Sequence, residues 1–381
     1  MRNTVFMAAA LAVAISGKLK GENDDAPPDQ TNVYDRIWDR AILYENAEGT
    51  FVQDFRFSGL IQADAAFFDG DGDGGDYQRL LWRRVRLGFK SSFLDDFILH
   101  SEVDLDLNDV DPIEDAYGRF TEAYVAWSPE EYFTLKVGKQ SAPFTLDGAT
   151  SSKGLLTLER SQVATNLWFP TEYFTGLSGN GEAGDWSYHA GIYSSSGDDE
   201  FGSFESGWFG LISFGRDLSE RTGLDTSSVR LDYVYNDPDY SGDVGTRDLA
   251  HVVSLSSKFA DGRFGVWTDI AFGSGLGDQG DLFGLQLMPY YDLSERWQLV
   301  SRYSFVSGAG DNSVRLNRYE SRIEPRSGDE AHEFYLGLNC FLYGHKLKWQ
   351  NGVEYSYAGG LDGGGDSYSG WGFTSGIRLS W

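Results

Sequence analysis

The sequence contains few cysteines, prolines and methionines, and these shortages narrow the class of protein. The one cysteine, Cys340, rules out an internal disulfide framework and any zinc site built from cysteines. It lies in the apolar stretch "FYLGLNCFLY", where we expect it to be a small buried hydrophobic residue. Nine prolines and three methionines stand against 47 glycines and 15% aromatic residues. This balance is typical of many strands joined by glycine-rich turns.

Long apolar runs are also scarce, and the single clear one is "TVFMAAALAVAIS", residues 4–16. It is shorter than the roughly 20 residues of a membrane-spanning helix, and it follows Arg2 as the core of a secretory signal would. We therefore predict a signal peptide at residues 1–17, with an N-terminal helix as the alternative. Residues 18–52 are predicted to be a periplasmic linker or a short helix, because Val33, Ile37, Ala41 and Ile42 have helical spacing.

Basic residues are outnumbered, with 31 Lys and Arg against 58 Asp and Glu, which excludes nucleic acid as a partner. The five histidines are scattered, and the sequence has neither H-E-x-x-H nor G-x-S-x-G. We therefore predict that the protein is not an enzyme and needs no cofactor or metal. The enzymatic alternative is an outer-membrane hydrolase.

From about residue 53 to the end, apolar residues recur at every second position. Phe55, Phe57, Ile61 and Phe67 share one parity, for example, while Gln62 and other polar residues occupy the other. Sixteen such runs can be counted: 53–68, 78–93, 96–107, 119–128, 131–141, 173–182, 185–195, 205–215, 227–237, 248–260, 263–274, 281–293, 296–307, 331–343, 346–357 and 369–381.

The lengths of these runs and of their connections identify the fold. Most runs are about twice as long as the 5–6 residues usual in soluble domains and suit a tilted strand that crosses a bilayer. Short turns alternate with long loops along nearly the whole chain. The sequence therefore predicts an all-β fold, a transmembrane antiparallel β-barrel of about 16 strands over residues 53–381, with 14 or 18 strands as alternatives.

This fold implies the bacterial outer membrane as the location, with its lipid and lipopolysaccharide as neighbours. The chain ends in "GWGFTSGIRLSW", with Phe373, Ile377, Leu379 and Trp381 on one parity, as such barrels commonly end. The acidic stretch "FFDGDGDGGDY" begins like a calcium loop, but its twelfth position is Leu80 rather than the required glutamate. We interpret it as the tip of the first external loop.

Several stretches together resemble one porin family. "FSGLIQADAAFFDG", "WRRVRLGF", "LKVGKQSAPFTLDGATSSKGLLTLERS" and "YFTGLSGNG" resemble the phosphate-selective porin O and P family, most clearly over about residues 55–182. The resemblance implies a homotrimer of sixteen-stranded barrels. It also implies that the third external loop, residues 142–172, folds into the lumen and that basic residues and serine hydroxyls there bind phosphate or similar small anions.

The resemblance assigns the candidate pore residues position by position. Those of the constriction and anion site are Arg83, Arg84, Ser151, Ser152, Lys153 and Arg160, and the strand pattern adds Arg86. Three positions depart from the family pattern: Gly148 stands where the family has a central lysine, Leu60 where it has an arginine, and Thr121 where it has an acidic residue.

Strand parity gives a separate expectation for these side chains. It places Arg84, Arg86 and Lys90 in the lumen and Arg83 on the outer face, unless a bulge intervenes. The competing interpretation of the lumen arginines is a set of wall charges paired with Asp64, Glu102 or Asp104. For Ser151, Ser152 and Lys153 it is a solvated loop tip. Glu159 is expected to hold the loop by pairing with a neighbouring arginine.

The sequence thus predicts a water-filled passive channel for small hydrophilic solutes and ions, weakly anion-preferring. A barrel that acts as a structural anchor or adhesin is the alternative. A secreted β-sandwich that binds carbohydrate is disfavoured, because the long two-faced runs would leave large apolar faces exposed.

Overall fold

The computed structural model describes residues 33–49, 51–108, 116–130, 132–310, 313–362 and 364–381. The predicted signal peptide, residues 1–17, lies outside these described residues. The described residues fall into two units, residues 33–40 and residues from Ala41 to Trp381. In the predicted linker, helix α2 (Val33–Trp38) is followed by the 3-10 turn η1 (Asp39–Ala41) and by a short strand, β1 (Ile42–Glu45). The helical pattern therefore ends before Ile42, which belongs to a strand.

Sixteen further strands make up most of the second unit. They are β2 (Val52–Gly70), β3 (Tyr77–Phe93), β4 (Phe97–Leu105), β5 (Tyr117–Glu130), β6 (Phe133–Ser141), β7 (Tyr173–Ala183), β8 (Trp186–Ser194), β9 (Gly207–Asp217), β10 (Thr226–Pro238), β11 (Leu249–Asp261), β12 (Phe264–Gly275), β13 (Asp281–Asp292), β14 (Trp297–Ala309), β15 (Glu330–Tyr343), β16 (Leu347–Leu361) and β17 (Asp366–Ser380). All sixteen predicted runs are confirmed.

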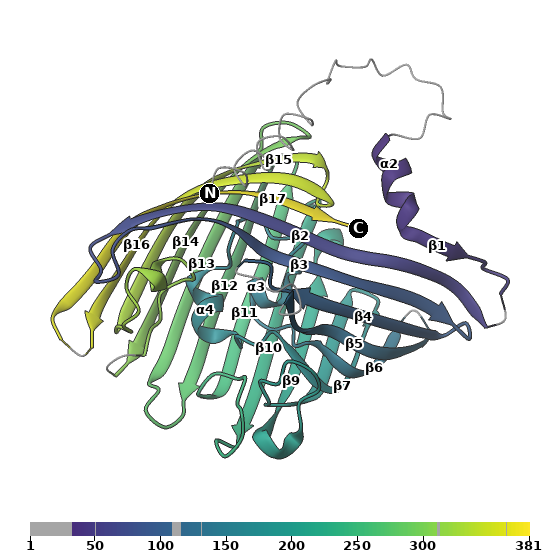
Figure 1. Ribbon diagram of the computed structural model, residues 1–381, viewed down its shortest axis with the longest axis horizontal. Helices are drawn as coiled ribbons and strands as arrows, with labels where there is room; N and C mark the ends of the chain where they lie inside the picture. The colour runs from purple at the N-terminus through teal and green to yellow at the C-terminus, as the bar shows by residue number, and fades with distance from the viewer. Residues whose placement is uncertain (1–32, 50, 109–115, 131, 311–312, 363) are drawn as a thin grey trace. The chain divides into compact units, whose positions relative to one another are not determined.

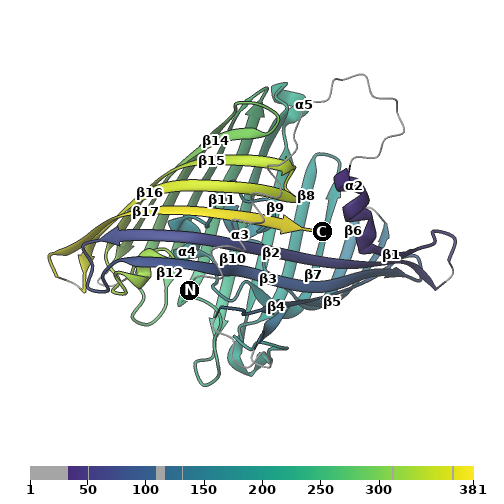
Figure 2. The ribbon, with the colours of Figure 1, turned by 45° about the horizontal axis from the view of Figure 1, so that its top comes forward.

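The strands close into an antiparallel barrel. Each of β2 to β16 pairs with the next strand along the chain, and β17 pairs with β2. Both views show the last strand, in yellow, beside the first, in purple (Figures 1 and 2). Closure satisfies every strand edge in the ring, as a bilayer requires of an all-β protein.

The two faces of the barrel differ in chemistry as the alternation predicted. On β16, Trp349 and Val353 are exposed, whereas the intervening Gln350 and Glu354 are buried. On β2, Phe67 is exposed, whereas Asp64 is buried. An apolar outer face and a polar inner face suit a barrel surrounded by lipid. None of the helices in the described residues is both long and apolar enough to cross a membrane.

Short turns and long connections lie at opposite ends of the strands. The connection between β9 and β10, which is long for a turn, contains the helical turn α5 (Ser219–Thr222). At the other end, the β6–β7 connection contains α3 (Leu146–Ala149) and α4 (Gln162–Leu167), the β8–β9 connection contains η3 (Phe204–Ser206), and the β14–β15 connection contains η4 (Glu320–Arg322).

The acidic tip between β2 and β3 packs against another loop. The backbone N–H of Gly74 donates to Ile323 O at 2.7 Å. A Cβ added at Gly74 would lie 2.5 Å from Arg322 O, so only glycine allows this approach. Asp71 accepts hydrogen bonds from the backbone N–H and the hydroxyl of Ser369. The glycines therefore allow the tip to contact the β14–β15 loop as well as to turn.

The seam between β17 and β2 depends on one glycine and the last residue. Gly59 and Trp381 exchange two backbone hydrogen bonds, of 3.2 and 3.1 Å. The indole ring of Trp381 covers Gly59 so closely that an added Cβ would lie 2.1 Å from the ring. The C-terminal aromatic ring thus occupies space that a glycine leaves free at the closing strand pair.

We expect Gly59→Val to displace the Trp381 ring and weaken closure, because overpacked sites typically lose about 1–3 kcal/mol. Samples are heated to a series of temperatures before electrophoresis. The band of the folded barrel should disappear at a lower sample temperature for Gly59→Val than for wild type. Gly179→Ala is the matched control, since its Cβ would meet nothing nearer than 3.5 Å. Equal melting of wild type and Gly59→Val would contradict this role of the seam.

Candidate functional site

A β-bulge places two consecutive arginines on the same face of β3. Gln62 of β2 pairs with Arg84 and Ala63 pairs with Trp82, so Arg83 is left without a partner in the register. The Arg83 side chain forms a bidentate ion pair with Glu159 of the β6–β7 loop, with an Nη2–Oε2 distance of 2.7 Å. Strand parity alone put Arg83 on the outer face unless a bulge intervened. The bulge is present, so the outward placement of Arg83 was wrong. The predicted pairing of Glu159 with an arginine is observed.

The β6–β7 loop, residues 142–172, is an ordered and largely buried segment. Thr145 caps α3 by accepting from the Gly148 N–H, and Ser161 caps α4 by accepting from the Ala164 N–H. Apolar side chains along the loop are buried, namely Phe144, Leu146, Leu155, Leu156, Leu158, Val163, Leu167 and Phe169. Figure 1 shows α3 and α4 among the strands of the barrel.

Polar side chains on the buried face of the strands hold this loop through its backbone. Arg302 of β14 donates to Glu159 O at 2.8 Å, Asn339 of β15 donates to Leu156 O at 2.8 Å, and Lys348 of β16 donates to Leu155 O at 2.5 Å. Asp232 of β10 and Asp269 of β12 accept from the N–H groups of Thr145 and Leu146, at 3.1 and 2.8 Å. The loop is thus held by side chains of five strands between β10 and β16.

Gly148, at the position where the phosphate-selective porin O and P family has a lysine, is covered by an aromatic ring. A Cβ at this position would lie 2.7 Å from the ring of Trp168. The guanidinium of Arg160 lies over the same indole, 4.5 Å from its centroid. A longer side chain at residue 148 would require Trp168 and the stacked Arg160 to move.

The three predicted residues at the loop tip have different environments. Ser151 is exposed, whereas Ser152 is buried and its carbonyl accepts from Gln62 Nε2 at 3.2 Å. The Lys153 N–H donates to Ser151 Oγ at 3.3 Å. Among the described residues, no carboxylate lies within ion-pair distance of the Lys153 ammonium.

Glu172, at the end of the loop, is surrounded by three of the predicted arginines. Its carboxylate oxygens lie 3.3 Å from Arg160, 3.7 Å from Arg84 and 3.8 Å from Arg86. Burial alone would raise the pKa of Glu172, but Arg160, Arg84 and Arg86 outweigh it and lower that pKa to about 2. The structure thus gathers Arg84, Arg86 and Arg160 around one carboxylate and leaves an excess of positive charge.

Carboxylates partly neutralise the remaining charge, as the wall-charge interpretation expected. Arg86 lies 3.4 Å from Asp104 and 4.0 Å from Glu102, and it also donates to Tyr173 Oη at 2.6 Å. Burial would raise the pKa of Glu159 as well, but the adjacent Arg83 holds it well below its ordinary value. Both loop carboxylates are therefore ionised near neutral pH.

A cavity of about 460 Å³ lies between the β6–β7 loop and the β14–β15 loop, at the end of the barrel that has long connections. Among the described residues that line it, six are arginines and two are glutamates: Arg83, Arg160, Arg247, Arg315, Arg318 and Arg322, with Glu159 and Glu172. Burial and the neighbouring Arg315 lower the pKa of Arg247 to about 9, so it too is cationic near neutral pH.

Four of these arginines were missed by sequence reasoning. They lie in long connections, where a basic residue is normally interpreted as exposed to solvent: Arg247, Arg315, Arg318 and Arg322. The described residues place no carboxylate within ion-pair distance of any of the four. The available signal was the clustering of Arg315, Arg318 and Arg322 within eight residues of one connection, although only Glu320–Arg322 of this stretch is helical.

The β14–β15 loop presents that face by fixing its other face to the barrel. Asn317 donates to Glu333 Oε2 at 2.5 Å, and Tyr319 donates to Asp64 Oδ2 at 2.9 Å. Ile323 is fully buried. Residues that point toward the wall thus alternate with arginines that line the cavity.

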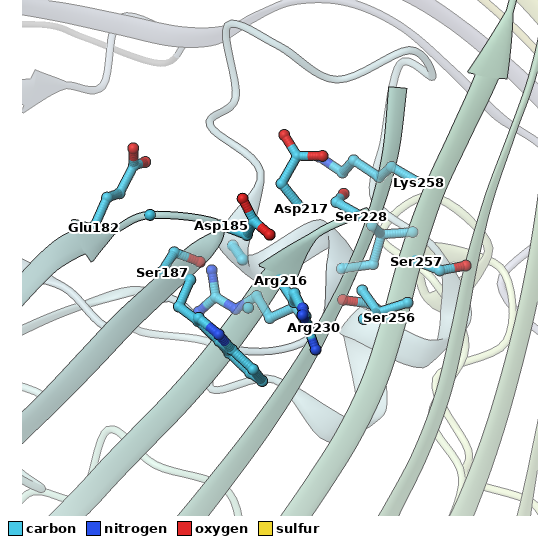
Figure 3. A pocket seen from close by; sticks show the side chains of 16 residues that line it. Glu182, Asp185, Ser187, Arg216, Asp217, Ser228, Arg230, Ser256, Ser257 and Lys258 are labelled. Atoms are coloured by element: carbon cyan, nitrogen blue, oxygen red, sulfur yellow. The ribbon is translucent and has the colours of Figure 1, made fainter. Parts of the chain in front are cut away.

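A second cavity, of about 310 Å³, lies below α3 at the end of the barrel with short turns. Figure 3 shows its lining, to which Arg230 of β10 and Lys258 of β11 contribute cationic groups and Asp217 and Glu182 contribute carboxylates. Lys258 Nζ also donates to Thr150 Oγ1 of the β6–β7 loop at 3.3 Å. Leu146 and Ala149 of that loop line this cavity, whereas loop residues from Glu159 to Glu172 line the first one.

Comparison with known proteins agrees with this architecture. Residues 55–210 match the family model "Phosphate-selective porin O and P". No curated protein matches the sequence. Solved structures with the same fold include an anion-selective porin from Comamonas acidovorans, with 13% identity, a TM-score of 0.59 and coverage of 86% of this chain and 99% of that one.

Two further structures extend the comparison. OprB of Pseudomonas putida, at high pH, has 10% identity and a TM-score of 0.57, with coverage of 86% of this chain and 94% of that one. The trimer form of OmpT, an outer membrane protein of Vibrio cholerae, has 11% identity and a TM-score of 0.54, with coverage of 86% and 99%. At these identities the likeness shows the fold alone. The porin family match and the closed barrel together place this chain in the outer membrane as a channel-forming β-barrel.

Proposed function

We propose that this protein is a passive diffusion channel for small hydrophilic solutes and ions, with a weak preference for anions. The observation that carries the preference is the cavity lined by six arginines and two glutamates. Both glutamates are already paired with arginines, so the cavity has a net positive charge at neutral pH. Rings of charge at a narrow point govern the selectivity of other pores.

The β6–β7 loop, residues 142–172, is the proposed constriction. Its backbone is bound by side chains of several strands, and its residues line both cavities. Arg84, Arg86, Arg160 and Lys153 supply its positive charge, and the bulge adds Arg83. Ser151, which is exposed, offers a hydroxyl that can donate to a passing anion.

The formal net charge of −27 does not set the selectivity at this depth. Carboxylates at the loop tips, such as Asp69 and Asp73, are exposed to solvent. At physiological salt the Debye length is about 8 Å, so the field of such carboxylates is largely screened at the constriction. Charges at the constriction and in the arginine cavity therefore dominate.

Phosphate is an expected but weakly bound permeant anion. The planar guanidinium of arginine can bond two oxygens of such an anion at once. However, Gly148 stands where the similar porin family has a central lysine, and the charges of Arg84, Arg86 and Arg160 are already partly neutralised by the Glu172 carboxylate, which lies within ion-pair distance of all three. We further propose that the chain assembles as a homotrimer, like the trimer form of OmpT, with outer-membrane lipid and lipopolysaccharide around it.

The reversal potential in a potassium chloride gradient tests the proposed selectivity. We expect a modest chloride preference in wild type. The double substitution Arg318→Gln and Arg322→Gln should lower the chloride-to-potassium permeability ratio about two- to five-fold, because two charges leave a partly screened aqueous site. Arg326→Gln is the control, since Arg326 is paired with Glu324 at 2.8 Å and does not line the cavity.

A clear potassium preference in wild type would overturn the proposed anion selectivity and leave the channel itself standing. A correctly folded barrel that inserts but does not conduct would instead favour a structural anchor or adhesin. Block of the current by micromolar phosphate would show that Gly148 weakens the site less than we propose.

Deletion of residues 148–157 tests the constriction. We expect single-channel conductance to rise, because this part of the loop contains the exposed tip and the carbonyls that Asn339 and Lys348 hold. Deletion of residues 239–244 from the β10–β11 connection is the control, and it should leave conductance near the wild-type value. If both deletions give wild-type conductance in folded protein, residues 142–172 do not form the constriction.

A further inference from the structure

Three buried carboxyl groups meet where the β14–β15 loop lies against the barrel wall. Glu320 comes from η4 in the loop, Glu333 from β15 and Glu354 from β16. Glu333 is fully satisfied, because Arg302 and Asn317 donate to its two oxygens. Glu320 and Glu354 have no such cationic partner at ion-pair distance among the described residues.

Glu320 and Glu354 contact each other. Their carboxyl groups lie within hydrogen-bonding distance. Glu320 Oε1 accepts from Ser356 Oγ at 2.9 Å, but its Oε2 is buried and receives no hydrogen bond from the described residues. An ionised carboxylate has only acceptors, so two of them can bond only if they share a proton.

The groups around this pair favour the shared proton. Those that face it from the packed elements are Ser356 and Glu354 on β16, Glu333 and Tyr335 on β15, Arg302 on β14, Tyr368 on β17, and Glu320 itself with Glu324 on the loop. Arg302 is already engaged by Glu333 at 2.5 Å. Burial and the facing carboxyls therefore raise the pKa of Glu320.

The position of the helical turn η4 depends on this contact. Asn317 and Tyr319 link the loop to the wall before Glu320, and Arg326 lies 3.4 Å from Asp366 of β17 after it. Between these links, Glu320 begins η4, which ends at Arg322. The arginines of the same segment line the cavity at the mouth of the proposed constriction. A change at Glu320 would therefore move Arg318 and Arg322.

We propose that the proton shared by Glu320 and Glu354 is a latch that holds the β14–β15 loop against the wall. While the proton is bound, the loop is fixed and the arginine cavity keeps its shape. When the proton leaves, two like charges face each other in a buried site, and the η4 part of the loop leaves the wall. The effect on ion current rests on the proposed function, whereas detachment of the loop does not.

The direction of the pH dependence follows from the site that binds the proton. The latched state binds the proton more tightly than the released state, so its extra stability is complete below the ordinary carboxyl pKa. That stability is lost as the pH rises through the raised pKa of Glu320. The latch is therefore closed in acid and opens towards alkaline pH.

Limited trypsin digestion of the detergent-folded protein tests the latch without any need for conduction. Cleavage after Arg315, Arg318 and Arg322 requires this part of the loop to leave the wall, because Asn317, Tyr319 and Ile323, which lie beside these arginines in the chain, are buried. At about pH 8.5 we expect wild type to be nicked about ten-fold faster than Glu320→Gln, and at about pH 5.5 we expect equal rates.

Glutamine at residue 320 can donate to the Glu354 carboxylate at every pH, so Glu320→Gln fixes the latch. Glu354→Gln should behave in the same way. If Glu320→Gln does not fold, Glu354→Gln is used in its place. Glu324→Gln is the matched control: its carboxylate pairs with Arg326 in the same loop, and it should keep the wild-type pH dependence. Comparing each variant with wild type at one pH removes the pH dependence of trypsin.

Bilayer recordings give the second measurement. Channel closures should become more frequent in wild type as the pH rises over the same range, and they should stay rare in Glu320→Gln. Equal nicking of wild type and both glutamine variants at every pH would overturn the latch. A folded barrel with pH-dependent nicking but no current would overturn the proposed channel and leave the latch standing.

Discussion

The buried ion pair between Arg302 and Glu333 is the interaction on which the interior of this barrel depends. Both side chains are completely removed from solvent. Arg302 holds the β6–β7 loop through Thr157 Oγ1 and the carbonyl of Glu159, while Glu333 holds the β14–β15 loop through Asn317. Loss of either charge would leave the other buried without compensation, at a cost of about 3–5 kcal/mol. The two loops are therefore positioned by one pair of charges on neighbouring strands.

That arrangement explains how an acidic protein can present a basic interior surface. The strand carboxylates Asp64 and Glu333 form ion pairs with the internal arginines Arg378 and Arg302, respectively. The exposed carboxylates lie on the loop tips and do not reach the arginine cavity at physiological salt. The net charge of the protein governs its solubility and its long-range interactions. The charges on the β6–β7 and β14–β15 loops govern the electrostatic potential inside the barrel.

The strands could be predicted from the sequence because alternation is a local property. Each of the sixteen runs contains its own evidence, and closure follows from the need to satisfy strand edges in lipid. The exact register could not be predicted, because a β-bulge reverses which face of the sheet every later residue of the strand points to. Arg83 faces the interior for that reason, and a count of parity alone puts it outside.

The loops were harder to predict because their order comes from distant residues. Arg318 and Arg322 line a cavity only because Asn317 and Tyr319 bind strands on the opposite side of the same segment. The absence of a lysine at Gly148 was visible, but its reason was not. Trp168, twenty residues later in the chain, covers that glycine and stacks with Arg160.

The short strand β1 has a consequence for how the barrel behaves beside other copies of itself. β17 pairs with β2 only from Leu60 onward, so the earlier part of β2 would otherwise offer free backbone groups at the seam. β1 pairs there with Asp54, Phe55 and Arg56, and Glu45 forms an ion pair with Arg56 at 3.3 Å. An open edge is a template for strand addition by another chain. The residues just before the barrel therefore pair backbone groups of β2 that would otherwise be available to another chain.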